Sequence, residues 1–168
     1  TDVLLEPPTP APEVLAATLD DTSYETHKII GDLRVPIPLF NIYLSEADEQ
    51  SRRLATELAE WTMETTAPVS DNAIALAHSL AGNSATVGYS DLSHMARGLE
   101  HALMRSQATG EGDAAEAELF NEVAEEIRRL LHQFAAGILK PVSSALIERL
   151  ADHERTTEQR RLAIAERR

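Results

Sequence analysis

The sequence predicts an all-α fold: an antiparallel up-down four-helix bundle with additional N-terminal and C-terminal helices. Apolar residues make up 43% of the 168 residues but aromatic residues only 4%, and alanine and leucine are abundant. This composition favours helices, because strands prefer β-branched and aromatic side chains. Apolar residues also recur at helical spacing in several long segments, and the short connections between them predict antiparallel neighbours.

Composition divides the chain into three segments. Residues 1–23 are rich in proline and polar residues, which predicts a linker. Residues 24–150 hold the helical bundle, and residues 151–168 are highly charged, which predicts a helical extension or a second linker. The chain begins with Thr1 and a proline-rich segment, and we expect it to be a piece of a longer protein.

Two short elements are predicted before the main helices. One is a helix over residues 13–19, within the first linker. In residues 24–38, Gly31, Pro36 and Pro38 interrupt any long element. We therefore expect a short helical segment there that packs on the bundle.

Apolar residues at spacings of three and four define the main helices. Gly88 is a natural C-terminal stop for the second of them, and residues 109–113 form a glycine-containing turn before the fourth. Residues suited to N-capping stand at three expected starts: Ser70 or Asp71, Ser90, and Ser143 or Ser144. The expected helices span about residues 39–64, 71–87, 91–107, 114–139 and 145–168.

The net charge of −13 limits the classes of partner. Nucleic-acid phosphates and anionic lipids would repel such a chain, so we expect neither nucleic acid nor a membrane as a partner. An acidic surface suits a domain that is monomeric in isolation. The absence of cysteine excludes disulfides and thiolate metal sites, and no apolar run approaches the roughly 20 residues of a membrane span. No signal peptide is visible, and we expect a cytoplasmic location.

The most informative stretch is residues 77–88, which read AHSLAGNSATVG and surround His78 with small residues. In a helix, Leu76, Leu80 and Val87 fall near one stripe, which predicts the buried face. His78 falls on the other side. An exposed histidine with little around it suits a docking protein that must bring a reactive group to the imidazole. The small neighbours of this histidine are Ala75, Ala81 and Gly82, with Ala85 further along.

The pattern around the histidine continues into the next predicted helix. Its residues are His78, Ser79, Leu80, Ala81 and Gly82, then Ala85, Gly88, Leu99 and Glu100. They resemble the histidine phosphotransfer (HPt) domain, most closely that of CheA-type chemotaxis kinases. In that family one helix reads His-x-x-Lys-Gly, followed by small residues and a glycine, and the next helix carries His-x-x-Glu. The resemblance covers about residues 39–139 and implies a four-helix core, often with a fifth helix.

The resemblance implies a role for each matching residue. His78 would carry a phosphoryl group between a kinase and an aspartate of a response regulator. Glu100 would accept a hydrogen bond from Nδ1 of His78 and leave Nε2 free to react. Gly82 would let the regulator's backbone approach closely, unless another helix packs against it instead. The docking surface would include Ser79, Ala81, Ala85 and Gly88.

The chain departs from the family pattern at two positions. The family lysine is replaced by Ala81, and the family histidine of His-x-x-Glu is replaced by Arg97. A cation near the phosphoryl oxygens would offset their charge, and Arg97 is suited to supply it. The equal alternative is that Arg97 only pairs with Glu100 or another acid. The Arg97 substitution and the additional helices are more similar to the HPt modules of hybrid CheA-like kinases that control type IV pili and twitching motility.

Two functional hypotheses follow from the resemblance. In the first, the domain transfers phosphate between the ATP-binding domain of a histidine kinase and a receiver domain, which would hold the Mg²⁺ that transfer needs. In the second, it is a degenerate HPt-fold module that binds a regulator or scaffolds a complex without phosphotransfer. A third hypothesis is an unrelated acidic helical bundle that only mediates protein contacts.

The sequence lacks the signatures of a self-sufficient enzyme. It contains neither a glycine-rich phosphate loop nor a nucleophile elbow, so we expect no ATP site, bound cofactor or metal in this domain. The parent protein is expected to be a histidine kinase. Structural or solvent-exposed roles are expected for the remaining histidines: His27, His94, His101, His132 and His153.

Overall fold

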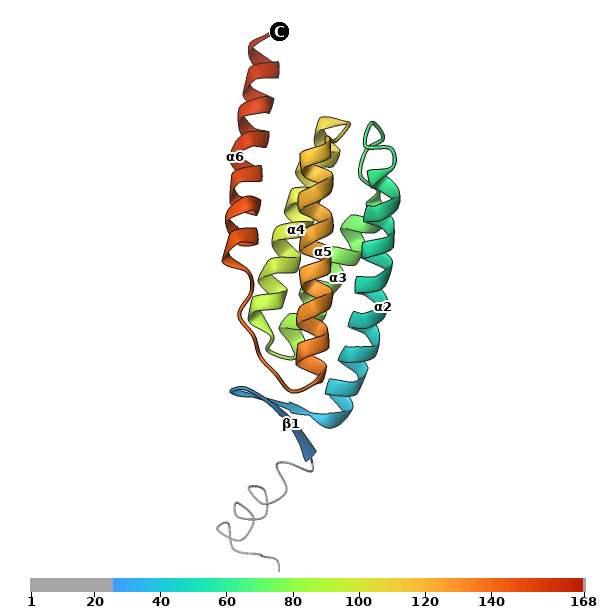
Figure 1. Ribbon diagram of the computed structural model, residues 1–168, viewed down its shortest axis with the longest axis vertical. Coiled ribbons are helices and arrows are strands. Elements are labelled where there is room, and N and C mark those ends of the chain that lie inside the picture. Colours follow the sequence, from blue (N-terminus) through green and yellow to red (C-terminus); the bar gives the residue numbers. More distant parts are fainter. Residues whose placement is uncertain (1–25, 168) are drawn as a thin grey trace, which may run out of the picture.

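The computed structural model describes residues 26–167, and four antiparallel helices form the predicted bundle (Figure 1). The predicted linker of residues 1–23 and the predicted helix over residues 13–19 lie outside the described residues. A two-stranded hairpin precedes the bundle, and a further helix follows along its side. The elements are β1 (His27–Ile30), β2 (Leu33–Pro36), α2 (Ile37–Thr62), α3 (Asp71–Thr86), α4 (Ser90–Thr109), α5 (Ala114–Ala135) and α6 (Ser144–Glu166).

The prediction of a short helical segment in residues 24–38 is wrong, because most of this segment is the β1–β2 hairpin. Gly31 has a φ of 57°, a left-handed conformation that closes the tight turn between the strands. The flanking isoleucines and Val35 favour extended backbone, and Ile30 and Val35 are buried at the end of the bundle. Pro38 does not break a helix but stands within the first turn of α2, where its missing N–H costs nothing.

The caps explain most helix boundaries. The Ser70 hydroxyl accepts a hydrogen bond from the Ala73 amide at the start of α3, and Gly88 adopts a φ of 83° just after its end. Ser143 caps α6 in the same way as Ser70 caps α3. Ser90 is not a cap, as it is the first helical residue of α4.

The fourth helix ends four residues earlier than predicted. α5 stops at Ala135 because Gly137 turns into the left-handed region with a φ of 85°. The Ile138 amide then donates to the Gln133 carbonyl and satisfies one of the last carbonyls of the helix.

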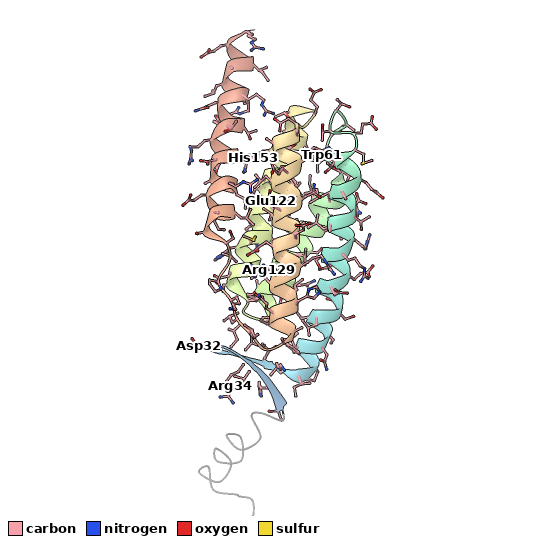
Figure 2. All side chains as sticks on the ribbon, viewed as in Figure 1. Asp32, Arg34, Trp61, Glu122, Arg129 and His153 are labelled. Atoms are coloured by element: carbon pink, nitrogen blue, oxygen red, sulfur yellow. The ribbon has the colours of Figure 1, made fainter. Side chains whose placement is uncertain are left out.

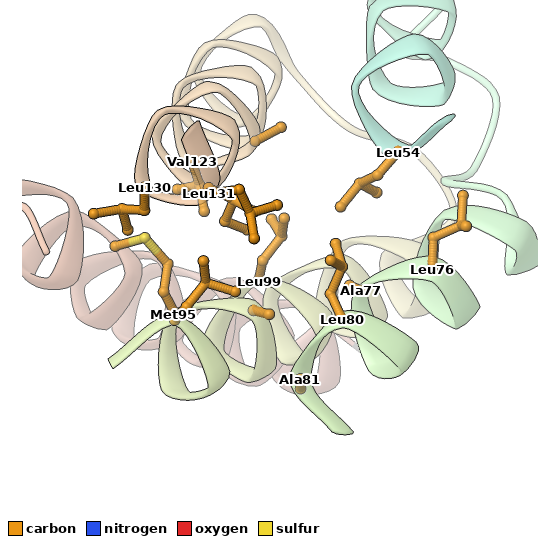
Figure 3. Packing of buried hydrophobic residues seen from close by; sticks show 14 of the residues in the cluster. Leu54, Leu76, Ala77, Leu80, Ala81, Met95, Leu99, Val123, Leu130 and Leu131 are labelled. Atoms are coloured by element: carbon orange, nitrogen blue, oxygen red, sulfur yellow. The ribbon is translucent and has the colours of Figure 1, made fainter. Parts of the chain in front are cut away.

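Leucines and other apolar side chains from all four bundle helices meet in one core (Figure 3). Leu54 of α2, Leu80 of α3 and Leu99 of α4 are fully buried there. The predicted buried stripe of α3 is confirmed, as Leu76, Leu80 and Val87 are all buried. This packing fixes the rotation of α3, and thereby the side of the bundle on which His78 emerges.

A buried cluster of polar side chains connects α6 to the bundle. Nε2 of His153 lies 2.6 Å from Oε2 of Glu116 on α5, and Arg105 of α4 donates to Nδ1 of His153 at 3.1 Å. Because a guanidinium only donates, Nδ1 is the acceptor and the Nε2 proton is shared with Glu116. His153 therefore has a structural role on the face of α6 that meets the bundle (Figure 2). The sequence analysis missed this cluster.

Ionisation of a tyrosine in the core is expected to destabilise the fold at alkaline pH. Tyr89 stacks on Phe134 with ring centroids 4.5 Å apart, and its buried hydroxyl has no hydrogen-bond partner within residues 26–167. Burial, reinforced by the carboxylates of Asp91 and Glu126, raises the pKa of Tyr89 to about 12. The unfolded chain ionises this group near pH 10, so the stabilisation is complete below pH 10 and is lost as pH rises toward 12.

The substitution Tyr89→Phe is expected to flatten this alkaline loss by up to about 1.4 kcal/mol per pH unit. At neutral pH it should cost little, because no hydrogen bond is broken. Urea denaturation of both proteins between pH 7 and pH 12 measures the effect.

Tyr43→Phe is the comparison at neutral pH, because the Tyr43 hydroxyl bonds to Ser84 at 2.7 Å. Burial also raises the pKa of Tyr43, so this variant should flatten the alkaline loss as well. It should lose about 1 kcal/mol at neutral pH. An alkaline slope unchanged by Tyr89→Phe would contradict the assignment.

Candidate functional site

His78 lies in the middle of α3, on the side opposite the core. Its side chain is 67% exposed, although the leucines two residues before and after it are buried. The histidine is therefore held on a rigid helix while its ring remains open to an incoming group. This is the orientation that the helical pattern of residues 77–88 predicts.

Glu100 of α4 holds the ring from one side. Its Oε2 lies 2.9 Å from Nδ1 of His78, as the sequence analysis expects. An ionised carboxylate only accepts hydrogen bonds, so the proton lies on Nδ1 and the lone pair of Nε2 is free. This arrangement selects the tautomer in which the outward nitrogen is a nucleophile.

The Glu100 carboxylate is largely buried and has few polar neighbours. Its side chain is 12% exposed, and its Oε1 is buried without a hydrogen-bond partner within the described part of the chain. The ring of His78 is thus the one group among residues 26–167 that hydrogen-bonds to this carboxylate. A charge-assisted bond of this kind strengthens when positive charge develops on the ring.

Gly82 leaves open space one turn beyond the histidine. A Cβ placed there would meet no atom within 4 Å among the described residues. The alternative that another helix packs against this glycine is therefore wrong. Its backbone conformation requires no glycine either, since its φ is not positive. Neither packing nor backbone conformation therefore requires a glycine at this helix-interior position, where glycine weakens the helix.

The expected docking residues divide into two groups. Ala85 is exposed, Ser79 is half-buried, and both lie on the same side of α3 as His78 or beside it. Gly88 is exposed as well, but its positive φ gives it a structural reason at the end of the helix.

The placement of Ala81 on the docking surface is wrong. This residue is fully buried against α4, where its carbonyl accepts a hydrogen bond from Oγ of Ser93 at 2.8 Å. Residues 77, 81 and 84 form a buried stripe of small side chains on α3, in which Ala81 meets α4 and the Ser84 hydroxyl bonds to Tyr43 of α2. The position of the family lysine thus belongs to a helix interface in this chain.

Arg97 is exposed on α4, one turn before Glu100. It forms no hydrogen bond or ion pair with any residue from 26 to 167, so the expected alternative of pairing with Glu100 is absent. The arginine is available to a bound anion.

His78 also lines an open groove of about 790 Å³ between α2 and α3. The contribution of α2 was not predicted from the sequence, because charged residues on an exposed helix face do not by themselves indicate a binding site. The lining of the groove includes Glu46, Asp48, Glu49, Arg52 and Arg53 from α2, with Ser79, Gly82 and Asn83 from α3.

No group of three or more histidine, aspartate or glutamate side chains within residues 26–167 could hold a metal ion. His94 and His101 are both exposed on α4. None of the helices in this range is long and apolar enough to cross a membrane.

Comparison with known protein families assigns the chain to one of them. Residues 38–137, which include α3 to α5 and all of α2 except its first residue, match the model of the Hpt domain family. The chain therefore belongs to the Hpt family, whose members serve histidine phosphotransfer in phosphorelay signalling and interact with kinases and receiver domains. No curated protein matches the chain.

The pairing of His78 with Glu100 predicts a tautomer that can be measured. The position of the proton is read from ¹⁵N spectra of the neutral imidazole, recorded at a pH above which the ring signals no longer change. We expect Nδ1 of His78 to carry the proton, and Glu100→Ala to release this preference. Glu118→Ala, an exposed acid on α5, is the control and should leave the spectrum unchanged. A proton found on Nε2 in the unsubstituted chain would contradict the assignment.

Gly82→Ala is expected to stabilise the domain. Alanine exceeds glycine by about 1 kcal/mol in a helix interior, and the added methyl group meets open space. Urea denaturation at neutral pH measures the change. The control is Gly112→Ala, where the added Cβ would collide with the Trp61 ring and should destabilise. A loss of stability in Gly82→Ala would reveal a packing contact.

Proposed function

We propose that this Hpt domain accepts a phosphoryl group on Nε2 of His78 and passes it on to an aspartate of a receiver domain. The observation that carries the proposal is one exposed imidazole whose other nitrogen is hydrogen-bonded to Glu100. The donor would be a kinase ATP-binding domain, since this sequence has no glycine-rich phosphate loop.

The chemistry follows from the two ring nitrogens. The lone pair of Nε2 forms a bond to phosphorus, while the bond between phosphorus and the leaving oxygen of ATP breaks and ADP departs. The ring gains positive charge in this step, and the Glu100 carboxylate at Nδ1 stabilises it. In the second step the Nε2–phosphorus bond breaks and the receiver aspartate takes the phosphoryl group. The Mg²⁺ for that step is expected in the receiver.

The surface around His78 supports docking of a globular partner. Gly82 leaves room one turn away, and Ser79 and Ala85 present small side chains beside it. Arg97 of α4 is exposed and makes no hydrogen bond or ion pair with residues 26–167, which makes it one candidate cation for the docked assembly. The acidic chain is expected to act as a monomer in isolation, without nucleic acid or membrane partners.

A buried alanine favours a second candidate function. The family lysine near the phosphoryl group has no counterpart at Ala81, which packs against α4. A module without that cation could bind a receiver, or scaffold a signalling complex, without carrying phosphate.

The wider setting is also a proposal. The arginine at position 97 and the additional helix α6 support a parent of the hybrid CheA-like type, a histidine kinase of chemotaxis or type IV pilus control. Such a parent would place this domain in the cytoplasm.

Phosphorylation of His78 is tested with a partner kinase domain and ATP. The chain should gain an acid-labile label, and His78→Gln should lose it completely, since amide nitrogen is no nucleophile. His94→Gln, an exposed histidine on the neighbouring helix, is the matched control and should keep the label. Full labelling of His78→Gln would refute the assignment, and an unlabelled wild type would favour the scaffolding alternative.

A further inference from the structure

The groove beside His78 is built from two facing stripes. On α2 the stripe contains residues 45, 46, 48, 49, 50, 52 and 53, and on α3 it contains residues 78, 79, 82 and 83. Both sets follow the spacing of one helix face. The histidine thus has a second wall on α2, on the side away from Glu100 and α4.

Hydrogen bonds between the helices set the register of these stripes. Asn83 donates to Gln50 at 3.1 Å, and Asn72 donates to Glu57 at 2.9 Å. In antiparallel helices, residues between 50 and 57 lie opposite residues between 72 and 83. Arg53 falls near the middle of the first interval and His78 near the middle of the second, so both stand at the same level of the bundle.

The groove contains one arginine that is already paired and one that is free. Arg52 forms ion pairs with Asp48 and Glu49 on its own helix, so these carboxylates offset its positive charge. Arg53 is exposed and has no hydrogen bond or ion pair with any residue in the described range. A third carboxylate in the groove, Glu46, lies seven residues before Arg53, or about 10 Å along the helix.

The hydrogen bond to Glu100 turns the reactive nitrogen of the ring away from α4. Nδ1 of His78 points to Glu100 on α4, and in an imidazole the lone pair of Nε2 points nearly the opposite way. A phosphoryl group on Nε2 would then face away from α4. The lysine position on α3 is no alternative source of charge, because Ala81 is buried.

We propose that Arg53 of α2 contacts the oxygens of a phosphoryl group on Nε2 of His78 and supplies the positive charge that residue 81 lacks. This proposal rests on the proposed function. Its basis is the shared groove, the common level of the two residues and the absence of any partner for Arg53 among residues 26–167. The fork of a guanidinium suits two phosphoryl oxygens at once.

The test uses the whole chain and the small donor phosphoramidate, so that no partner surface is involved. In the reaction the Nε2–phosphorus bond forms, the phosphorus–nitrogen bond of the donor breaks, and ammonia leaves with its electron pair. Phosphate uptake on His78 and the half-life of the product are followed by ³¹P spectra. We expect Arg53→Ala to slow uptake or shorten the half-life by roughly five- to tenfold, since the contact is exposed.

Two further variants and a change of salt concentration make the result specific. Arg53→Lys should recover most of the rate, and Arg52→Ala, in the same groove but internally paired, should change it less than twofold. The loss in Arg53→Ala should shrink in about 1 M salt, where screening acts within about 3 Å. Alanine favours helix, and an unchanged urea midpoint will show that the fold is intact.

Each outcome decides one of the two proposals. Uptake and half-life equal to wild type in Arg53→Ala would overturn the role of Arg53 while leaving phosphotransfer in place. The same holds if Arg97→Ala alone causes the loss, which would assign the cation to α4. No phosphate on His78 in the wild type would overturn the proposed function and this inference together.

Discussion

The hydrogen bond between Nδ1 of His78 and Oε2 of Glu100 is the constraint on which the site depends. It spans two helices, so it requires α3 and α4 to lie close together at one level. Ala81 is small and fully buried where its carbonyl accepts the Ser93 hydroxyl of α4, and this contact allows that approach. The core leucines on either side of His78 then fix the rotation of α3, so that the ring emerges outward while Nδ1 remains within reach of the carboxylate.

Close packing of α3 against α4 has a chemical consequence. The residue three positions after the histidine is committed to the helix interface, where Ala81 also accepts the Ser93 hydroxyl. A long cationic side chain would be buried there at considerable cost. In the proposed phosphotransfer, positive charge for the phosphoryl group is expected from a neighbouring helix, and α2 and α4 each offer one exposed arginine without a partner among residues 26–167.

The helical spacing of apolar residues and the capping residues predicted the bundle and the exposed histidine, because these two features depend on short-range spacing along a helix. The His78–Glu100 contact was predictable only through family resemblance, since no spacing relates residues on different helices. Three features were missed or mistaken for a common reason: they depend on tertiary packing. The hairpin of residues 27–36 contains a glycine turn and β-branched residues that also fit a broken helix. The burial of Ala81 depends on α4, and the pairing of His153 with Glu116 depends on how α6 lies on the bundle.

The central claim is that the outward nitrogen of one histidine carries the phosphoryl group while the inward nitrogen keeps its proton for Glu100. Correlated ³¹P and ¹⁵N spectra of the phosphorylated, ¹⁵N-labelled chain test this most directly, because they identify the bonded nitrogen. The account predicts phosphorus coupled to Nε2 of His78, with a protonated Nδ1 on the same ring. Phosphorus coupled to Nδ1, or to a nitrogen of any other histidine, would contradict it.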